Sequence, residues 1–180
     1  PGEVIAGKYR VEATIGEGGM AVVLAATHEI LRQRVAVKVL QPKYAASREL
    51  RERFFREARA LAALKSEHVA RIFDVGTLET GAAYLVLEHL DGLDLHEVLQ
   101  RDGAVHWRRA VRYILQACEG LKEAHSLGIL HRDLKPSNMF LATEAKTDGR
   151  IKLLDFGLAK LKEEGVTGLT GAEAVMGSPS

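Results

Sequence analysis

HRDLKPSN at residues 131–138, followed by DFG at residues 155–157, decides how this 180-residue chain is interpreted. Transfer of a phosphoryl group needs a carboxylate that positions the acceptor hydroxyl, a cation that neutralises phosphate charge, and hard oxygen ligands for magnesium. Asp133 can serve as the base and Lys135 as the cation. Asn138, the only asparagine in the chain, and Asp155 can serve as oxygen ligands. The two stretches therefore predict a phosphoryl-transfer site.

The same two stretches resemble the catalytic loop and the metal-binding turn of the eukaryotic-type (Hanks-type) serine/threonine protein kinases, including bacterial members. That family carries a Gly-rich loop, a strand lysine and a helix glutamate earlier in the chain, and all three are found here in that order. The resemblance implies an α+β fold with two lobes. The small lobe would hold a five-stranded antiparallel sheet and one helix, and the large lobe would be mainly helical and incomplete here.

The Gly-rich stretch is IGEGGMAVV at residues 15–23, in which Ala21 replaces the third glycine. A Gly-x-Gly-x-x-Gly pattern also marks dinucleotide-binding folds, where the loop opens a helix. Residues 21–27 (AVVLAAT) are instead apolar and β-branched, which predicts a strand. A strand-loop-strand unit favours a phosphate-covering loop, in which Gly16, Gly18 and Gly19 let the backbone approach phosphate oxygens. Without the other motifs, an ordinary glycine hairpin remains an open alternative.

Lys38 is the one charge inside the apolar run VAVKVL at residues 35–40. An ammonium in such a strand needs a partner, because burying an unpaired charge is costly. Glu57 lies on the margin of an apolar helical stripe within residues 47–65, formed by Leu50, Phe54, Ala58 and Leu61. By resemblance, Lys38 holds the first two phosphates of ATP and Glu57 holds Lys38.

The resemblance also implies an ATP site between the lobes, with Mg²⁺, or Mn²⁺, as the metal. Glu88-His89-Leu90 would be the hinge, whose Glu88 carbonyl and Leu90 amide meet the adenine edge. Asp94 could bind ribose or cap the helix that begins at Leu95, and both readings stay open. The remaining nucleotide contacts implied are Ile15, Val23, Ala36, Leu87 and Phe140.

The catalytic and regulatory roles follow the family's motif, residue by residue. Asp133 would orient the acceptor hydroxyl, Lys135 would steady the γ-phosphate, and Asn138 and Asp155 would coordinate magnesium. His131 and Phe156, with Leu61 and Ile72, would form an internal apolar column. Arg132 would pair with a phosphate on the segment after DFG, where Thr170 and then Thr167 are the expected autophosphorylation sites. Ser178 matches a position that contacts the base and peptide, whereas Ala174 stands where many relatives carry their phosphorylated threonine.

Composition agrees with an enzyme of the cytoplasm that binds neither nucleic acid nor, within this segment, a membrane. The net charge is +1, and no apolar run approaches the roughly 20 residues of a membrane span. A tether outside these residues stays open. Cys118, the only cysteine, falls on the predicted helical stripe Ala110, Ile114, Cys118, Leu121 and Ala124, which places it in the core.

We expect one kinase domain, with residues 1–88 as the small lobe and 89–180 as the hinge and first part of the large lobe. The chain begins at Pro1 and stops at Ser180 before the family's later helices, so we interpret it as a segment of a longer polypeptide. The helix from Trp107 to Leu127 has apolar residues on more than one side, which predicts cover from those later helices.

Three classes of function are compatible with these motifs. The first is an ATP-dependent serine/threonine protein kinase acting in signal transduction on protein substrates, with self-association where it phosphorylates itself; Lys135, two residues after the base, favours it over tyrosine kinases. The second, a small-molecule phosphotransferase, is disfavoured by Arg132 and by Ser178-Pro179. The third is a catalytically incompetent nucleotide-binding kinase fragment or regulatory binding module.

Overall fold

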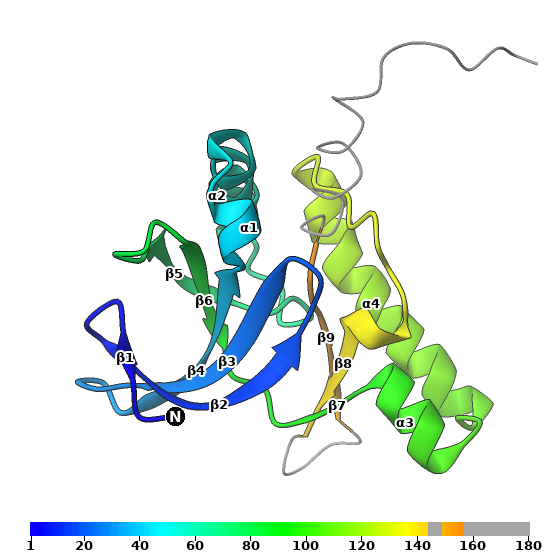
Figure 1. Cartoon of the computed structure of the whole chain (residues 1–180). Coiled ribbons are helices and arrows are strands. Elements are labelled where there is room, and N and C mark those ends of the chain that lie inside the picture. Colours follow the sequence, from blue (N-terminus) through cyan, green and yellow to red (C-terminus); the bar gives the residue numbers. More distant parts are fainter. Residues whose placement is uncertain (144–148, 157–180) are drawn as a thin grey trace, which may run out of the picture.

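The first half of the chain forms one antiparallel sheet. The computed structural model describes residues 1–143 and 149–156. The sheet has the strand order β1-β2-β3-β4-β6-β5, which Figure 1 shows beside helix α2. Its strands are β1 (Val4–Ile5), β2 (Tyr9–Glu17), β3 (Ala21–His28), β4 (Gln33–Leu40), β5 (Ile72–Thr77) and β6 (Ala83–Glu88). The last five account for the five-stranded sheet that the resemblance implied, and β1 is an addition that pairs with β2.

Helix α2 (Arg48–Ala62) follows the short helix α1 (Pro42–Ala45) and covers one side of this sheet. Ser47 caps α2, and its hydroxyl oxygen accepts a hydrogen bond from the Leu50 amide at 3.3 Å. The apolar stripe predicted for this helix supplies its buried residues, Phe54, Ala58 and Leu61. Phe54 and Ala58 share a core cluster with Leu40, Ala83 and Leu85 of strands β4 and β6. The helix therefore packs mainly on β5 and β6, and Leu40, at the end of the strand that carries Lys38, joins the same cluster.

The second part of the described chain is a small sheet with two helices. Helices α3 (Leu95–Asp102) and α4 (Trp107–Ser126) precede a 3₁₀ turn (Pro136–Asn138), and the sheet has the order β7-β8-β9. Its strands are β7 (Gly92–Asp94), β8 (Met139–Ala142) and β9 (Arg150–Leu153). Asp94 caps α3, since its carboxylate accepts the Glu97 amide at 2.8 Å while Glu97 reaches back to the Asp94 amide. The capping reading of Asp94 is confirmed.

The buried side of α4 differs from the predicted one. Its buried residues are Tyr113, Ala117, Gly120 and Ala124, and Cys118, expected in the core, is exposed. A Cβ atom on Gly120 would lie 3.0 Å from the His68 carbonyl oxygen and 3.1 Å from Leu153 Cδ1. Of the predicted stripe, Ala124 is buried and Leu121 packs against the core, whereas Ile114 and Cys118 are exposed. The prediction missed that the helix approaches β9 through Gly120, because a residue without a side chain adds nothing to an apolar pattern.

The opposite side of α4 carries large apolar residues in contact with solvent. The exposed fractions are 51% for Val111, 54% for Ile114 and 60% for Leu115. The expectation that this helix is apolar on more than one side is confirmed. Within the described residues, no helix combines the length and the apolar character that crossing a bilayer requires.

Gly92 provides a test of how β7 is held against β8. Its φ is +145°, and an added Cβ would lie 2.2 Å from the Leu141 carbonyl oxygen. We expect Gly92→Ala to lower the free energy of unfolding by about 2 kcal/mol or more, because strained backbone and a clash with a paired strand add together. Gly7→Ala is the matched control, since Gly7 has φ +64° with nothing within 4 Å, and should cost about 1 kcal/mol. Equal losses in urea unfolding would contradict the packing argument.

Candidate active site

A cavity of about 420 Å³ lies between the Gly-rich loop and the catalytic loop. It collects residues from β2, β3, β4, α2, the loop after His131 and the turn after β9. Most of the catalytic and phosphate-binding residues expected from the sequence line it: Gly16, Gly18, Gly19, Val23, Lys38, Asp133, Lys135, Asn138 and Asp155. It is also lined by Glu17, Met20, Ala21, Leu40 and Phe54, to which the sequence had assigned no contact with a nucleotide.

The Gly-rich loop joins two paired strands, as expected, and does not open a helix. Gly16 pairs with Val23, and Glu17 pairs with Val22. The Gly18 amide donates to the Ala21 carbonyl at 2.9 Å, while Gln41 Nε2 donates to the Gly18 carbonyl at 2.9 Å. Both bonds hold the loop over the cavity. The role of Gln41 was not foreseen, because a lone glutamine after a strand gives no signal.

The catalytic loop is organised around the Asp133 carboxylate. Lys135 Nζ lies 2.8 Å from Asp133 Oδ2, and Asn138 Nδ2 donates to the same oxygen at 3.0 Å and to the Asp133 carbonyl at 2.7 Å. The hydrogen bond from Lys135 is the main reason that the pKa of Asp133 lies below its usual value. Asp133 is therefore ionised at neutral pH, and the Asn138 amide nitrogen is committed, so its oxygen is the atom left for a ligand.

Two residues beside this carboxylate adopt backbone conformations that are rare for side chains with a Cβ. Arg132 has φ +63° and Asp155 has φ +55°. Around Arg132 the Asp133 amide donates to the His131 carbonyl at 2.8 Å, which closes a tight three-residue turn. Such strain persists only where surrounding contacts impose it, and it clusters at functional sites. Here it occurs next to the expected base, at Arg132, and at the expected metal ligand Asp155 itself.

Lys38 contacts a different carboxylate from the one expected. Its side chain is 11% exposed, and Nζ lies 2.5 Å from Asp155 Oδ1. Among the described residues, the ion pair of Lys38 is therefore with Asp155 and not with Glu57. Glu57 lines a second cavity of about 300 Å³, together with Arg53, Arg56, Ala60, Leu61, Gly128, Ile129, Leu130, Arg132 and Phe156. The side of α2 that bears Glu57 faces this second cavity, whereas Lys38 lines the first.

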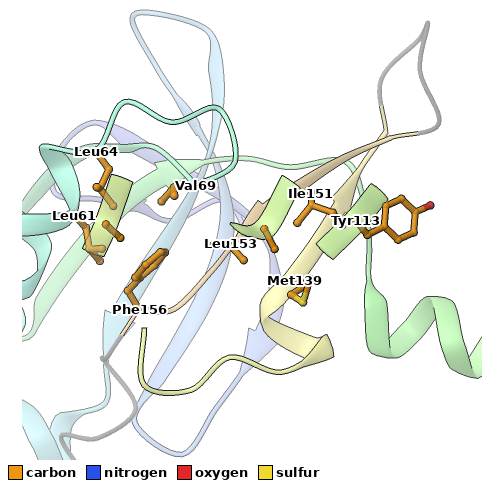
Figure 2. Close-up of a cluster of buried hydrophobic side chains, with 10 residues drawn as sticks. Leu61, Leu64, Val69, Tyr113, Met139, Ile151, Leu153 and Phe156 are labelled. Carbon is orange, nitrogen blue, oxygen red and sulfur yellow. The ribbon is translucent and has the colours of Figure 1, made fainter. Parts of the chain in front are cut away.

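The apolar column expected around His131 has the expected contacts. The rings of His131 and Phe156 lie 4.4 Å apart between centroids, and each residue is 3% exposed. Phe156 and Leu61 belong to one buried cluster, against which Ile72 packs. Figure 2 shows this cluster reaching from Leu61 and Phe156 to Leu153 and Ile151 of β9. Helix α2 is thereby packed against the turn that carries Asp155.

Burial lowers the pKa of His131 below its ordinary value, which predicts a pH-dependent stability. In the unfolded chain the imidazole of His131 binds a proton more readily, with a pKa of about 6.5. The free energy of unfolding should therefore fall as the pH drops below about 6.5 toward the lowered pKa of the folded protein. Above about pH 6.5, His131 should contribute no pH dependence. In His131→Phe, which keeps a ring against Phe156, the loss of Tm between about pH 7.5 and about pH 5.5 should be smaller. His96→Phe, at an exposed position, should follow the wild type; identical profiles for all three proteins would refute this.

Other expected nucleotide contacts lie outside the lining of the larger cavity. These are Ile15, Ala36, Leu87, Glu88, Leu90, Asp94 and Phe140. Ile15 is 54% exposed, and Ala36 is buried opposite Leu87 in the β4–β6 pair. Glu88 Oε1 lies 2.6 Å from Lys152 Nζ, so the expected hinge is tied to β9. Their contacts with a nucleotide stay predictions. Gly157, Thr167, Thr170, Ala174 and Ser178 lie outside the described residues.

Comparison with known proteins agrees with this arrangement. The family model "Protein kinase domain" matches residues 9–180. The serine/threonine-protein kinase pkn3 of Myxococcus xanthus is 39% identical over 99% of this chain, which spans 33% of that relative. The serine/threonine-protein kinase PknA of Mycobacterium tuberculosis is 36% identical over 98% of this chain, which spans 41% of it.

Solved structures show the same fold. The crystal structure of the Mycobacterium tuberculosis PknI kinase domain aligns with a TM-score of 0.72 and 34% identity. The alignment covers 87% of this chain and 62% of that domain. A family model over most of the chain, relatives above 30% identity and a shared fold converge on one assignment. The chain belongs to the protein kinase family.

Proposed function

We propose that the protein transfers the γ-phosphate of ATP to serine and threonine hydroxyls of protein substrates. One observation carries the proposal: a single cavity is lined by Asp133, hydrogen-bonded to Lys135 and Asn138, and by Lys38, paired with Asp155. These are a base, two phosphate-binding cations and two oxygen ligands. In this proposal residues 1–88 are the small lobe, and residues 89–180 are the hinge and a first part of the large lobe.

The donor set in the cavity fits Mg²⁺. Asn138 offers an amide oxygen and Asp155 a carboxylate. The Leu154 amide donates to the Asn138 carbonyl at 3.0 Å, and this hydrogen bond holds Asn138 close to Asp155, the residue after Leu154. Mg²⁺ is usually bound by one or two carboxylates together with substrate phosphates, rather than by a protein cage. Within the described residues there is no group of three or more His, Cys, Asp or Glu side chains placed to hold a metal. When bound, the ion, Mg²⁺ or Mn²⁺, would neutralise phosphate charge.

Each residue then has a defined task. Asp133, kept ionised by its lowered pKa, accepts the hydrogen bond of the substrate hydroxyl and contributes roughly 10²- to 10⁴-fold to the rate. Lys135 meets the transferred phosphate, and Lys38 meets the phosphates nearer the nucleoside. The Gly-rich loop supplies backbone amides above them. Glu57 would take over Lys38 when Asp155 binds metal, which is the role its family position predicts.

The partners and the location belong to the same proposal. Protein substrates follow from the family, and self-association would allow one copy to phosphorylate Thr170 or Thr167 of another. Arg132, which lines the smaller cavity with Arg53 and Arg56, would receive that phosphate by charge-assisted hydrogen bonds. ATP is abundant in the cytoplasm, so we place the catalytic part there.

The test is an assay of the full-length gene product with Mg-ATP. A generic protein substrate, aminoglycosides and water should be offered in parallel as acceptors, and phosphorylated residues should be identified by mass spectrometry. We expect phosphate on serine and threonine of proteins. Transfer only to small molecules would establish a small-molecule phosphotransferase, and ATP binding without transfer would establish a binding module.

A further inference from the structure

Strand β9 is held along both of its edges. One edge pairs with β8, and the other is closed by segments from elsewhere in the chain. Ile151 donates its amide to Gln116 Oε1 at 2.7 Å, and its carbonyl lies 3.0 Å from His68 Nδ1. Leu153 donates to the His68 carbonyl at 2.8 Å and accepts from the Ala70 amide at 3.0 Å. The second edge thus depends on α4 and on the loop between α2 and β5.

His68 is the side chain at the centre of this arrangement. It is 6% exposed, and a carbonyl oxygen can only accept, so Nδ1 carries the hydrogen that Ile151 receives. Its other nitrogen, Nε2, lies 3.4 Å from Glu119 Oε2 on α4 and 3.9 Å from Glu67 Oε1. The ring therefore connects β9 with α4 and not merely with its own loop.

The loop that carries His68 is anchored to α4 at a second point. The two oxygens of Glu123 accept the amides of Lys65 and Ser66 at 2.9 and 2.6 Å. Close contact is possible because Gly120 leaves room for the His68 backbone. Hydrogen bonds from main-chain amides to a carboxylate are among the stronger ones. The loop is thus a fixed support against which β9 is placed.

The position of β9 bears directly on the catalytic cavity. Leu153 is its last residue, and Asp155 follows two residues later. His68 does not line the cavity, so any effect on chemistry must pass through β9. Mutation of residues that orient a metal ligand without binding the metal themselves typically lowers metal affinity or activity by about 10- to 100-fold.

We propose that His68 is a positioning residue for Asp155: its Nδ1 hydrogen bond to Ile151 sets the place from which Asp155 presents its carboxylate to the metal ion. The part that concerns the metal rests on the proposed function. The part that concerns β9 does not, because it follows from hydrogen bonds among residues of the chain alone.

Two polar substitutions separate the hydrogen bond from general packing. In His68→Asn the amide nitrogen can take the place of Nδ1, whereas in His68→Gln it takes the place of Nε2. Hydrogen–deuterium exchange of residues 150–156 in the full-length protein should rise about tenfold in His68→Gln and stay within about twofold of wild type in His68→Asn. His96→Gln, at an exposed histidine, is the control and should change nothing.

A second readout follows the metal. Mn²⁺ binding in the presence of ADP, measured by electron paramagnetic resonance, should weaken about tenfold in His68→Gln and little in His68→Asn. Equal exchange in the two variants, or faster exchange without weaker Mn²⁺ binding, would overturn the proposal. If the wild-type protein binds Mn²⁺ but transfers no phosphate, the proposed function is wrong. The proposal for His68 is still tested in that case, because neither hydrogen–deuterium exchange nor Mn²⁺ binding depends on phosphate transfer.

Discussion

Asp133→Asn should reduce phosphate transfer by about 10²- to 10⁴-fold while the affinity for ADP stays within a few fold. The carboxylate acts on the acceptor hydroxyl and contacts Lys135 and Asn138. Asparagine nearly preserves its shape but cannot accept a proton. Single-turnover rates with Mg-ATP and a protein substrate, together with ADP titration, measure the two quantities separately.

Lys135→Met is the control that shows whether the loss of transfer in Asp133→Asn comes from the base itself or from the displaced Lys135. Because Lys135 Nζ bonds Asp133 Oδ2, the asparagine variant could release Lys135 as well. Lys135→Met retains Asp133 and removes only the cation, so its rate shows how much of the loss belongs to Lys135. Near-normal transfer by Asp133→Asn would remove Asp133 from the role of base.

Asp155→Asn should abolish the strengthening of ATP binding by Mg²⁺ and reduce transfer by about 10²-fold or more. Metal ions contribute several kcal/mol of charge stabilisation in such reactions, and each 1.36 kcal/mol is a factor of about ten in rate. ATP affinity measured with and without Mg²⁺ is the decisive comparison. An unchanged ratio of the two affinities would show that Asp155 is not a ligand.

The same variant tests which carboxylate Lys38 uses. The structure pairs Lys38 with Asp155, so Lys38→Met and Asp155→Asn should have non-additive effects on unfolding measured without nucleotide. Lys38→Met and Glu57→Gln should be additive in that state and coupled once Mg-ATP is present. Coupling of Lys38 to Glu57 without nucleotide would contradict the geometry described.

Three residues of the candidate site could be grouped from the sequence because they are nearly contiguous. Asp133, Lys135 and Asn138 share one loop, and a short turn forces them together. Two strands were predictable from the apolar runs at residues 21–27 and 35–40, which lie within two residues of the observed ends of β3 and β4. Asp94 was a predictable cap, since side chains of this type satisfy free amides at helix starts.

What failed depended on contacts between distant residues. Lys38 and Asp155 are 117 positions apart, and no local pattern indicates which carboxylate an ammonium will meet. The buried face of α4 is set by Gly120, which has no side chain to register in a periodicity. Strands β1 and β7 have 2 and 3 residues, too few to show an alternation.

The closed edge of β9 also bears on self-aggregation. A strand edge with free amides and carbonyls is a template for pairing with another chain, and β9 contains Ile151 and Leu153, both fully buried here. Detachment of the loop around His68 would uncover apolar side chains and unpaired backbone groups together. Substitutions at His68, Gln116 or Glu123 should therefore increase misassembly in cells out of proportion to the stability they remove.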